Sequence, residues 1–469
     1  MDEQLSFLPE IINDLNTSIF TVKGDTFVYF GKVKKFFKIE VSPSGYLMQI
    51  PILAEQGPYV LSSIVNSKQL KKIVSTFLKM SKRVIPGTTM MDLNKPWSIT
   101  RLYLNVSLDC NLRCKYCYVA DGREFMLATM PLTVATEAVD WLVTRKNHML
   151  PLQIRFFGGE PLLNMPVIRQ TILYCEKLKG KNNIKFEYFL STNGTLIDEE
   201  VALFLKQYNV HVKISIDGPE SVHNRNRKYA DGNGSYEATV RGIRTIQKCG
   251  VLPTACVTLE QLTAAQIKMS LEELRSMGIE NVQWQAAVLD SGVSAGDEAH
   301  ELEALACQCW EGVLSGYDGY LSLFAPGFKK MADPEPVFPG CGAGINSLMV
   351  SPNADLYLCQ RFLGQHDFVA GNIRKGCLNN KLKKIIFESI EAQLENCRNC
   401  WLVYLCSKGC FYANYFKRGD PGSVDGKACL DTAAYYRYAV WLLFQLTLKQ
   451  PQKLQGLLQH RTYMDVEHE

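Results

Sequence analysis

Residues 102–117, LYLNVSLDCNLRCKYC, decide the fold. Positions 102–108 alternate between apolar and more polar side chains, which is the pattern of a β-strand. The remaining positions hold Cys110, Cys114 and Cys117, with three and then two residues between them. In barrel enzymes the loops that follow the strands carry the chemistry, so this cysteine loop is the first candidate site.

Outward from this stretch the chain alternates between strand and helix patterns. Two stretches, Thr133 to His148 and Thr263 to Met277, place apolar residues at helical spacing. Such alternation predicts a parallel sheet covered by helices, either a partial (β/α) barrel or an open doubly wound sheet. Periodicity alone leaves that choice open. The further strand candidates are residues 152–157, 186–191, 212–216, 253–258 and 282–287.

The composition narrows the class of protein. The chain has 469 residues, a net charge of only +4 and sixteen cysteines. It shows no apolar run that could cross a membrane and no export signal at its start, so we expect a cytoplasmic protein without a membrane partner. The small net charge gives no reason to expect nucleic acid. In such a chain, cysteines indicate metal binding rather than disulfides.

The three cysteines of the first loop suit an iron–sulfur cluster. Three thiolates can bind three irons of a 4Fe–4S cluster and leave the fourth iron open. The alternative, a zinc loop, usually needs four ligands arranged in closely spaced pairs. At Cys110, Cys114 and Cys117 the sequence resembles the radical S-adenosylmethionine (SAM) superfamily. The resemblance implies that the open iron binds SAM, that Tyr116 lies near the adenine, and that cleavage yields a 5′-deoxyadenosyl radical.

The loops after the next three strands carry residues that resemble SAM-contacting motifs of that family. Gly158, Gly159 and Glu160 precede a proline, as in the family's GGEP motif. The glycines would allow a close approach to the ligand, and the carboxylate would receive the ammonium group of SAM. The resemblance further implies that Ser191 and Asp217 contact the ribose or the carboxylate of SAM.

A short basic segment follows Asp217. It contains His223, Arg225 and Arg227. One arginine could pair with a carboxylate, but we expect a solvated basic loop here.

A second group of cysteines lies in the last third of the chain and resembles the SPASM domain, which holds two auxiliary 4Fe–4S clusters. A pair of structural zinc ribbons is the alternative, but the group has only one pair at two-residue spacing. The resemblance assigns Cys341, Cys359 and Cys410 to the first auxiliary cluster. It assigns Cys397, Cys400, Cys406 and Cys429 to the second.

The first auxiliary set supplies only three ligands for four irons. Either one iron is open, or Cys377 fills the vacancy; we favour the open iron. An open iron could bind the thiolate of a substrate cysteine, since thiolates are ready metal ligands. A substrate carbon radical could then combine with that sulfur to form a thioether.

The N-terminal segment is β-rich and basic. Residues 1–95 hold 12 Lys or Arg against 8 Asp or Glu. Strands followed by a helix near Ser67 to Met80 fit a small winged-helix-like unit that binds a precursor peptide as an added strand. A structural cap is the plain alternative. The excess of lysines would suit an acidic leader.

The expected α/β architecture is therefore a partial (β/α)6 radical SAM barrel between two further units. We expect a leader-recognition unit over 1–95, the barrel over 96–310, a linker over 311–335, an irregular, cysteine-dense SPASM unit with a C-terminal helix over 336–450, and a tail over 451–469.

The expected function is thioether formation in a ribosomally made precursor peptide, as in the ranthipeptide-type maturases. The alternatives are formylglycine formation on a sulfatase, carbon–carbon cross-linking, or a non-catalytic iron–sulfur electron carrier. The implied cofactors are three 4Fe–4S clusters and SAM. The implied partners are a precursor peptide with its leader and an electron donor such as flavodoxin or ferredoxin.

Overall fold

A computed structural model describes the chain in fifteen stretches and forms two compact units. One unit combines Met1–Asp92, Val293–Cys341 and Glu388–Met464. The other combines Leu93–Gly292 and Gly342–Phe387 with Asp465–Glu469. The described residues are 17–30, 35–42, 45–54, 57–65, 69, 72–73, 99–117, 129–145, 151–182, 184–259, 263–286, 295–315, 319–333, 341–375 and 380–459.

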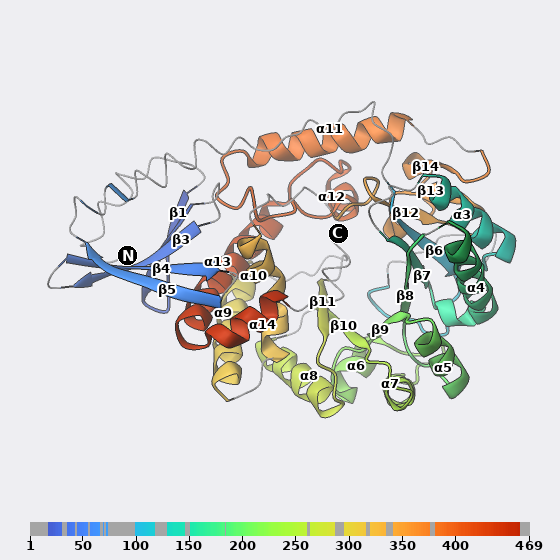
Figure 1. The fold of residues 1–469 in the computed structure, drawn as a ribbon, viewed down its shortest axis with the longest axis horizontal. Coiled ribbons are helices and arrows are strands. Elements are labelled where there is room, and N and C mark those ends of the chain that lie inside the picture. The colour runs from blue at the N-terminus through green and yellow to red at the C-terminus, as the bar shows by residue number, and fades with distance from the viewer. Residues whose placement is uncertain are drawn as a thin grey trace. The chain divides into compact units, whose positions relative to one another are not determined.

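The second unit is built on a parallel sheet whose six strands all match the predicted positions (Figure 1). Each strand pairs in parallel with the next one along the chain. A doubly wound sheet would reverse its order among these strands, whereas these six follow chain order, as the predicted partial barrel requires. The strands are β6 (Arg101–Ser107), β7 (Leu152–Gly158), β8 (Phe186–Thr192), β9 (His211–Ser215), β10 (Thr254–Leu259) and β11 (Val282–Ala286).

Amphipathic helices connect these strands. Leu104, Ile154 and Ile214 are fully buried strand residues, and they form a core with the apolar faces of the helices. Residues 146–148 of the first expected helix lie outside the described residues. The helices are α3 (Leu132–Thr144), the 3-10 turn η3 (Pro161–Asn164), α4 (Met165–Asn182), α5 (Glu199–Gln207), α6 (Glu220–Asn226), α7 (Tyr236–Lys248) and α8 (Ala264–Ser276).

Three short strands extend the barrel sheet beyond β6. Strand β12 (Ser347–Val350) pairs in parallel with β6. Strands β13 (Asp355–Tyr357) and β14 (Val369–Asn372) continue antiparallel. The expectation of an irregular cysteine-dense region was wrong here, and this pairing explains why residues 342–387 belong to the barrel unit rather than to a separate C-terminal domain.

Two helices in the same region were also missed. Helix α11 (Asn380–Cys397) and helix α12 (Phe411–Arg418) lie between the cysteines. Leu382, Ile386 and Ile390 are buried at four-residue spacing on α11, which is a helical pattern that the cysteines nearby obscured.

The first unit contains a five-stranded antiparallel meander in chain order. It differs from the expected winged-helix-like arrangement, and most of the expected helix from Ser67 to Met80 lies outside the described residues. The strands are β1 (Thr17–Val22), β2 (Asp25–Phe30), β3 (Lys35–Ser42), β4 (Gly45–Ala54) and β5 (Gly57–Val65).

C-terminal helices pack on this meander. Phe444 of α13 (Gly426–Lys449) meets Phe27 of β2 edge to face, with ring centroids 5.7 Å apart. Helix α13 contains the predicted C-terminal helix, and α14 (Pro451–Gln459) follows it inside the expected tail. Positions 460–469 lie outside the described residues.

The stretch expected as a linker, 311–335, is largely helical instead. It contains the end of α9 (Ala295–Leu314), the 3-10 turn η4 (Gly319–Leu323) and α10 (Ala325–Ala332). Phe324 stacks on Tyr435 of α13 with ring centroids 5.2 Å apart, so this stretch is part of the packed core. Among the described residues, no helix is both long and apolar enough to cross a membrane.

Candidate functional site

The cysteine loop, residues 110–117, follows β6 at the carboxyl end of the sheet. The backbone N–H groups of Arg113 and Lys115 donate to carbonyl groups in the segment 226–228, at 2.6 and 3.1 Å. The loop is therefore fixed at both ends, by β6 on one side and by the segment after α6 on the other.

The three thiols of this loop form one electrostatic group. Burial raises the pKa of the Cys110 thiol to about 12, and Glu160, Cys114 and Cys117 add to that effect. The Sγ atom of Cys110 also accepts the Leu112 N–H at 3.3 Å. Neighbouring thiols with N–H groups aimed at sulfur fit a metal cluster, because binding it would displace the thiol protons.

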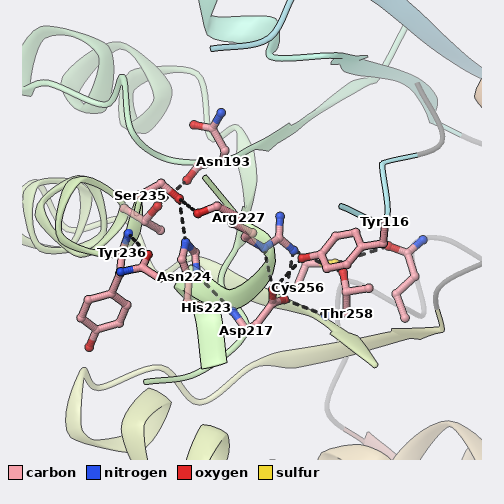
Figure 2. Close-up of polar contacts among 12 residues, drawn as sticks. Tyr116, Asn193, Asp217, His223, Asn224, Arg227, Ser235, Tyr236, Cys256 and Thr258 are labelled. Carbon is pink, nitrogen blue, oxygen red and sulfur yellow. Dashed lines mark hydrogen bonds and ion pairs between the residues drawn. The ribbon is translucent and has the colours of Figure 1, made fainter. Parts of the chain in front are cut away.

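Asp217, Arg227 and Tyr116 form a polar network (Figure 2), and Arg227 and Asp217 are near enough to Cys114 to act on the pKa of its thiol. Nε of Arg227 lies 2.8 Å from Oδ2 of Asp217, and Nη2 lies 3.0 Å from Oδ1. The Tyr116 hydroxyl donates to Oδ2 at 2.6 Å, and the guanidinium lies over the tyrosine ring, 5.2 Å from its centroid. Tyr116, which we expect to lie near the adenine of SAM, is thus held in one orientation.

The expectation of a solvated basic loop was wrong for Arg227 and His223. Both are buried, and Arg227 is the ion-pair partner of Asp217. The Asp217 carboxylate also accepts the N–H of Thr258 at 2.9 Å, so protein donors occupy its four lone-pair sites. In this structure Asp217 holds Tyr116 and Arg227, and its expected contact with SAM stays a prediction.

His223 completes the network as a neutral ring. Burial, with a smaller effect from the nearby Arg227, lowers its pKa to about 3. Nδ1 accepts the N–H of Asp217 at 3.4 Å, so Nε2 carries the proton and donates to Oγ of Ser235 at 2.9 Å. Figure 2 shows these side chains gathered between α6, α7 and the end of β9.

Glu160 is fully buried between the ends of β7 and β8. Oε1 accepts the Thr192 hydroxyl at 2.6 Å and the Leu162 N–H at 3.0 Å, and Oε2 accepts the Asn193 N–H at 2.8 Å. Burial raises its pKa to about 7, while these three hydrogen bonds oppose the rise. A carboxylate with no cation among these partners, and with acceptor capacity left on Oε2, fits the predicted ammonium site.

The two glycines before Glu160 lie directly against the backbone of another segment, which leaves no room for a side chain. A Cβ on Gly158, whose φ is +151°, would lie 2.0 Å from the Ser107 carbonyl oxygen. One on Gly159 would lie 2.5 Å from the Asp109 carbonyl oxygen. The close approach that we expected toward a ligand is here an approach to the start of the cysteine loop.

Sequence reasoning missed Asn193 and Asn111, which join the loops after β8 and β6. Nδ2 of Asn193 donates to Oδ1 of Asn111 at 2.8 Å and lies 3.9 Å from Sγ of Cys110. The Asn-Gly pair directly after a predicted strand was the available sign. Ser191 is half-buried in β8, and no hydrogen bond to its hydroxyl is found within the described stretches.

The four cysteines assigned to the second auxiliary cluster are also neighbours. Burial raises the pKa of the Cys429 thiol to about 11, and Cys397, Cys406 and Cys400 each add to the rise. The N–H of Leu402 donates to Sγ of Cys400 at 3.4 Å. These residues come from the end of α11, the loop after it and the first turn of α13, so the fold gathers thiols that lie far apart in sequence.

The other cysteine assignments stay predictions. Cys359 belongs to the barrel unit, Cys341 and Cys410 belong to the other unit, and Cys377 lies outside the described residues. Across the described ranges, no three or more Cys, His, Asp or Glu side chains converge tightly enough to hold a single metal ion.

Comparison with known proteins identifies the barrel. Residues 104–274 match the model of the radical SAM superfamily. An uncharacterised protein of Methanocaldococcus jannaschii is 34% identical over 150 residues, 32% of this chain and 49% of that protein. The radical SAM cyclopropyl synthase TigE of Paramaledivibacter caminithermalis is 29% identical over 165 residues, 32% of this chain and 33% of TigE. The chain thus spans half or less of these two relatives.

A longer match extends beyond the barrel. The cysteine-type anaerobic sulfatase-maturating enzyme of Clostridium perfringens is 24% identical over 330 residues, which cover 65% of this chain and 86% of that enzyme. The structure of anSMEcpe with bound AdoMet superposes with a TM-score of 0.64 at 22% identity, over 77% of this chain and 98% of that one. Streptococcus suis SuiB bound to its precursor peptide SuiA gives 0.52 at 17% identity, over 78% and 82%. These likenesses concern the fold.

Proposed function

We propose that this chain, whose residues 104–274 match the radical SAM superfamily, is a radical SAM enzyme that modifies a peptide. The observation that carries the proposal is the buried network of Tyr116, Asp217 and Arg227 beside the thiols of the cysteine loop. A non-catalytic electron carrier has no use for a fixed aromatic ring and a buried carboxylate beside three ligands.

In this proposal Cys110, Cys114 and Cys117 hold a 4Fe–4S cluster that, with SAM, supplies a 5′-deoxyadenosyl radical. Tyr116 presents its ring to the adenine, because its hydroxyl is tied to Asp217 and its face to Arg227. Glu160 receives the ammonium group of SAM at the free side of its carboxylate. These side chains orient and desolvate the cofactor before any reaction occurs.

The product that we propose is a thioether between a peptide cysteine and a carbon of the same peptide. The net change removes two hydrogen atoms: one would pass from carbon to the 5′-deoxyadenosyl radical, and the other would leave as the thiol proton while its electron passes to the first auxiliary cluster. Support comes from the three-cysteine set Cys341, Cys359 and Cys410, which would leave one iron free for the substrate thiolate. The four cysteines around Cys429 would hold the third cluster.

Sulfatase maturation is the second candidate. The 330-residue match to an anaerobic sulfatase-maturating enzyme supports sulfatase maturation about as well as the other comparisons support thioether formation. That reaction would turn a cysteine or serine of the protein substrate into formylglycine, so the thiol or hydroxyl would be replaced by an aldehyde rather than joined to another carbon.

A precursor peptide with a leader is the partner that we propose, with flavodoxin or ferredoxin as reductant. SuiB, a structural neighbour, is described bound to its precursor peptide. The five-stranded meander in this chain has β1 and β5 as its outer strands, and an added peptide strand is a common mode of recognition at a free edge.

Mass spectrometry separates the two products. The enzyme is incubated anaerobically with SAM, a reductant and candidate Cys-containing peptides. We expect a loss of two hydrogens together with loss of thiol alkylation. An aldehyde that reacts with a hydrazine reagent would favour sulfatase maturation, and an unchanged thiol count would remove the thioether proposal.

A further inference from the structure

Lys408 is a buried lysine inside the second cysteine group. It lies between Cys406 and Cys410, and only 4% of it is exposed. Its backbone N–H donates to Sγ of Cys406 at 3.3 Å. Its ammonium group donates to the carbonyl oxygen of Val403, which lies in the same loop. The side chain is therefore folded back over the loop that carries the thiols, and its charge is held inside the unit.

This charge has no carboxylate partner. The bond to Val403 is the one hydrogen bond that the described residues offer to Nζ, and none of the ion pairs found among them includes Lys408. Buried lysines are rare unless an anion compensates them, because desolvation of an ammonium ion is costly.

The thiols are the groups near Lys408 that can become negative. The backbone N–H of Lys408 points at Sγ of Cys406, and its ammonium group is held on the Val403 carbonyl between Cys400 and Cys406. A cluster with four thiolate ligands carries net negative charge and would supply the missing counter-charge. The buried ammonium group in this loop therefore fits a cluster held by the same loop, because the cluster would supply the negative charge that no carboxylate supplies.

The backbone at this position gives a second, independent observation. Lys408 has a φ of +60°, in the left-handed region that residues with a side chain seldom adopt. The next residue, Gly409, has a φ of +88°. Glycine would adopt this conformation at lower conformational cost than lysine.

We propose that Lys408 is the counter-cation of the cluster held by Cys397, Cys400, Cys406 and Cys429, and that it raises the reduction potential of that cluster. The inference rests on the proposed function, since it requires the second auxiliary cluster. Adding an electron makes the cluster more negative, and a fixed positive charge stabilises that reduced state. Lys408 thus places a positive charge beside the cluster, and this charge makes the cluster a better electron acceptor.

The test compares Lys408→Gln with Lys408→Arg, which keeps the charge. Both are made in a Cys114→Ala background that removes the SAM-binding cluster. Iron per chain is measured first, and the midpoint potentials are then measured by redox titration followed by electron paramagnetic resonance. We expect one midpoint to move to a more negative value in the Gln variant and to stay near that of the parent in the Arg variant. Lys179→Gln, an exposed lysine in the barrel unit, should shift nothing.

Each outcome decides the inference. Loss of about four irons in the Gln variant alone also supports it, because the charge is then required for assembly. Equal midpoints in parent and Gln variant at equal iron content overturn it. Loss of iron in both variants overturns it too, since the shape of lysine rather than its charge would matter. If the parent itself holds fewer iron atoms than two auxiliary clusters need, the proposed cluster count fails instead.

Discussion

Arg227 and Asp217 form a two-point ion pair in the interior of the barrel unit, with N–O distances of 2.8 and 3.0 Å. Their side chains are 7% and 2% exposed. The pair also fixes Tyr116, whose ring lies beneath the guanidinium and whose hydroxyl bonds the carboxylate. One buried pair therefore links the end of β9, the segment after α6 and the cysteine loop.

We predict that Asp217→Asn lowers the free energy of unfolding by about 3–5 kcal/mol, because it leaves Arg227 as an uncompensated buried charge. Urea unfolding under anaerobic conditions measures the change. Arg241→Ala is the control, since Arg241 pairs with Glu237 on an exposed face of α7 and should cost about 0.5 kcal/mol or less. Equal effects of the two substitutions would contradict the importance of the buried pair.

SAM binding should strengthen as the pH rises toward 7. Burial raises the pKa of Glu160 to about 7, and only its ionised form can hold the ammonium group of SAM. Between pH 6 and pH 7 the ionised fraction of Glu160 rises from roughly a tenth to roughly a half, while the α-amino group of SAM stays mostly protonated, so Kd should fall roughly fivefold. Equilibrium dialysis with labelled SAM measures this.

The same carboxylate gives a stability prediction of opposite sign. Its folded pKa lies above the ordinary value, so its contribution to the stability of the SAM-free protein is full at low pH and is lost as the pH rises from about 4.5 to 7.

The control for the binding prediction is Glu160→Gln, in which the Kd for SAM should not follow the titration of a carboxylate at this position. A wild-type Kd that does not change between pH 6 and pH 7 would remove Glu160 from the ammonium site.

Gly158→Ala should lower the free energy of unfolding by at least about 2 kcal/mol. The new Cβ would lie 2.0 Å from the Ser107 carbonyl oxygen, and the φ of +151° disfavours any side chain. Thermal unfolding checks this. The control is Gly456→Ala in α14, where the new Cβ would have no atom within 4 Å. This substitution should raise the free energy of unfolding by about 0.5–1 kcal/mol through helix propensity. A tolerated Gly158→Ala would show that β6 and β7 are further apart.

Trp401 attaches the second cysteine loop to the N-terminal meander. It directly follows Cys400, and its ring lies 5.7 Å from that of Phe20 and 5.4 Å from that of Tyr29. Trp401→Ala should cost about 1–3 kcal/mol and speed amide hydrogen exchange in β1 and β2. The control is Phe416→Ala, an exposed aromatic on α12, which should change stability by about 0.5 kcal/mol or less. Unchanged exchange in β1 and β2 would contradict this link.

The barrel strands were predictable because each is a short apolar run followed by loop residues, and the period of the pattern is set by the backbone. Their sequential order, however, is a property of pairing, which periodicity does not encode. Helix α11 was missed although Leu382, Ile386 and Ile390 have helical spacing, since nearby cysteines favoured an irregular interpretation. The meander was read as strands, but its final strand was not recognised.

The site was predictable where chemistry requires a residue type at fixed spacing. Cys110, Cys114 and Cys117, with Tyr116, lie together as expected. The buried position of Arg227 could not be predicted, because it depends on the ion pair with Asp217, which lies ten residues away in the sequence, and not on the residues next to Arg227. Glycines 158 and 159 were identified, but the group that they approach, the backbone at 107–109, is set by the pairing of β6 with β7.

The measurement that tests the account most directly is the yield of 5′-deoxyadenosine from anaerobically prepared protein with SAM and dithionite. We expect the wild-type protein to contain iron and to produce deoxyadenosine, and we expect Cys114→Ala to produce no deoxyadenosine. Cys341→Ala should keep part of this SAM cleavage but lose the cross-linked product. A colourless protein that contains zinc without iron, or equal deoxyadenosine from wild type and Cys114→Ala, would contradict the account.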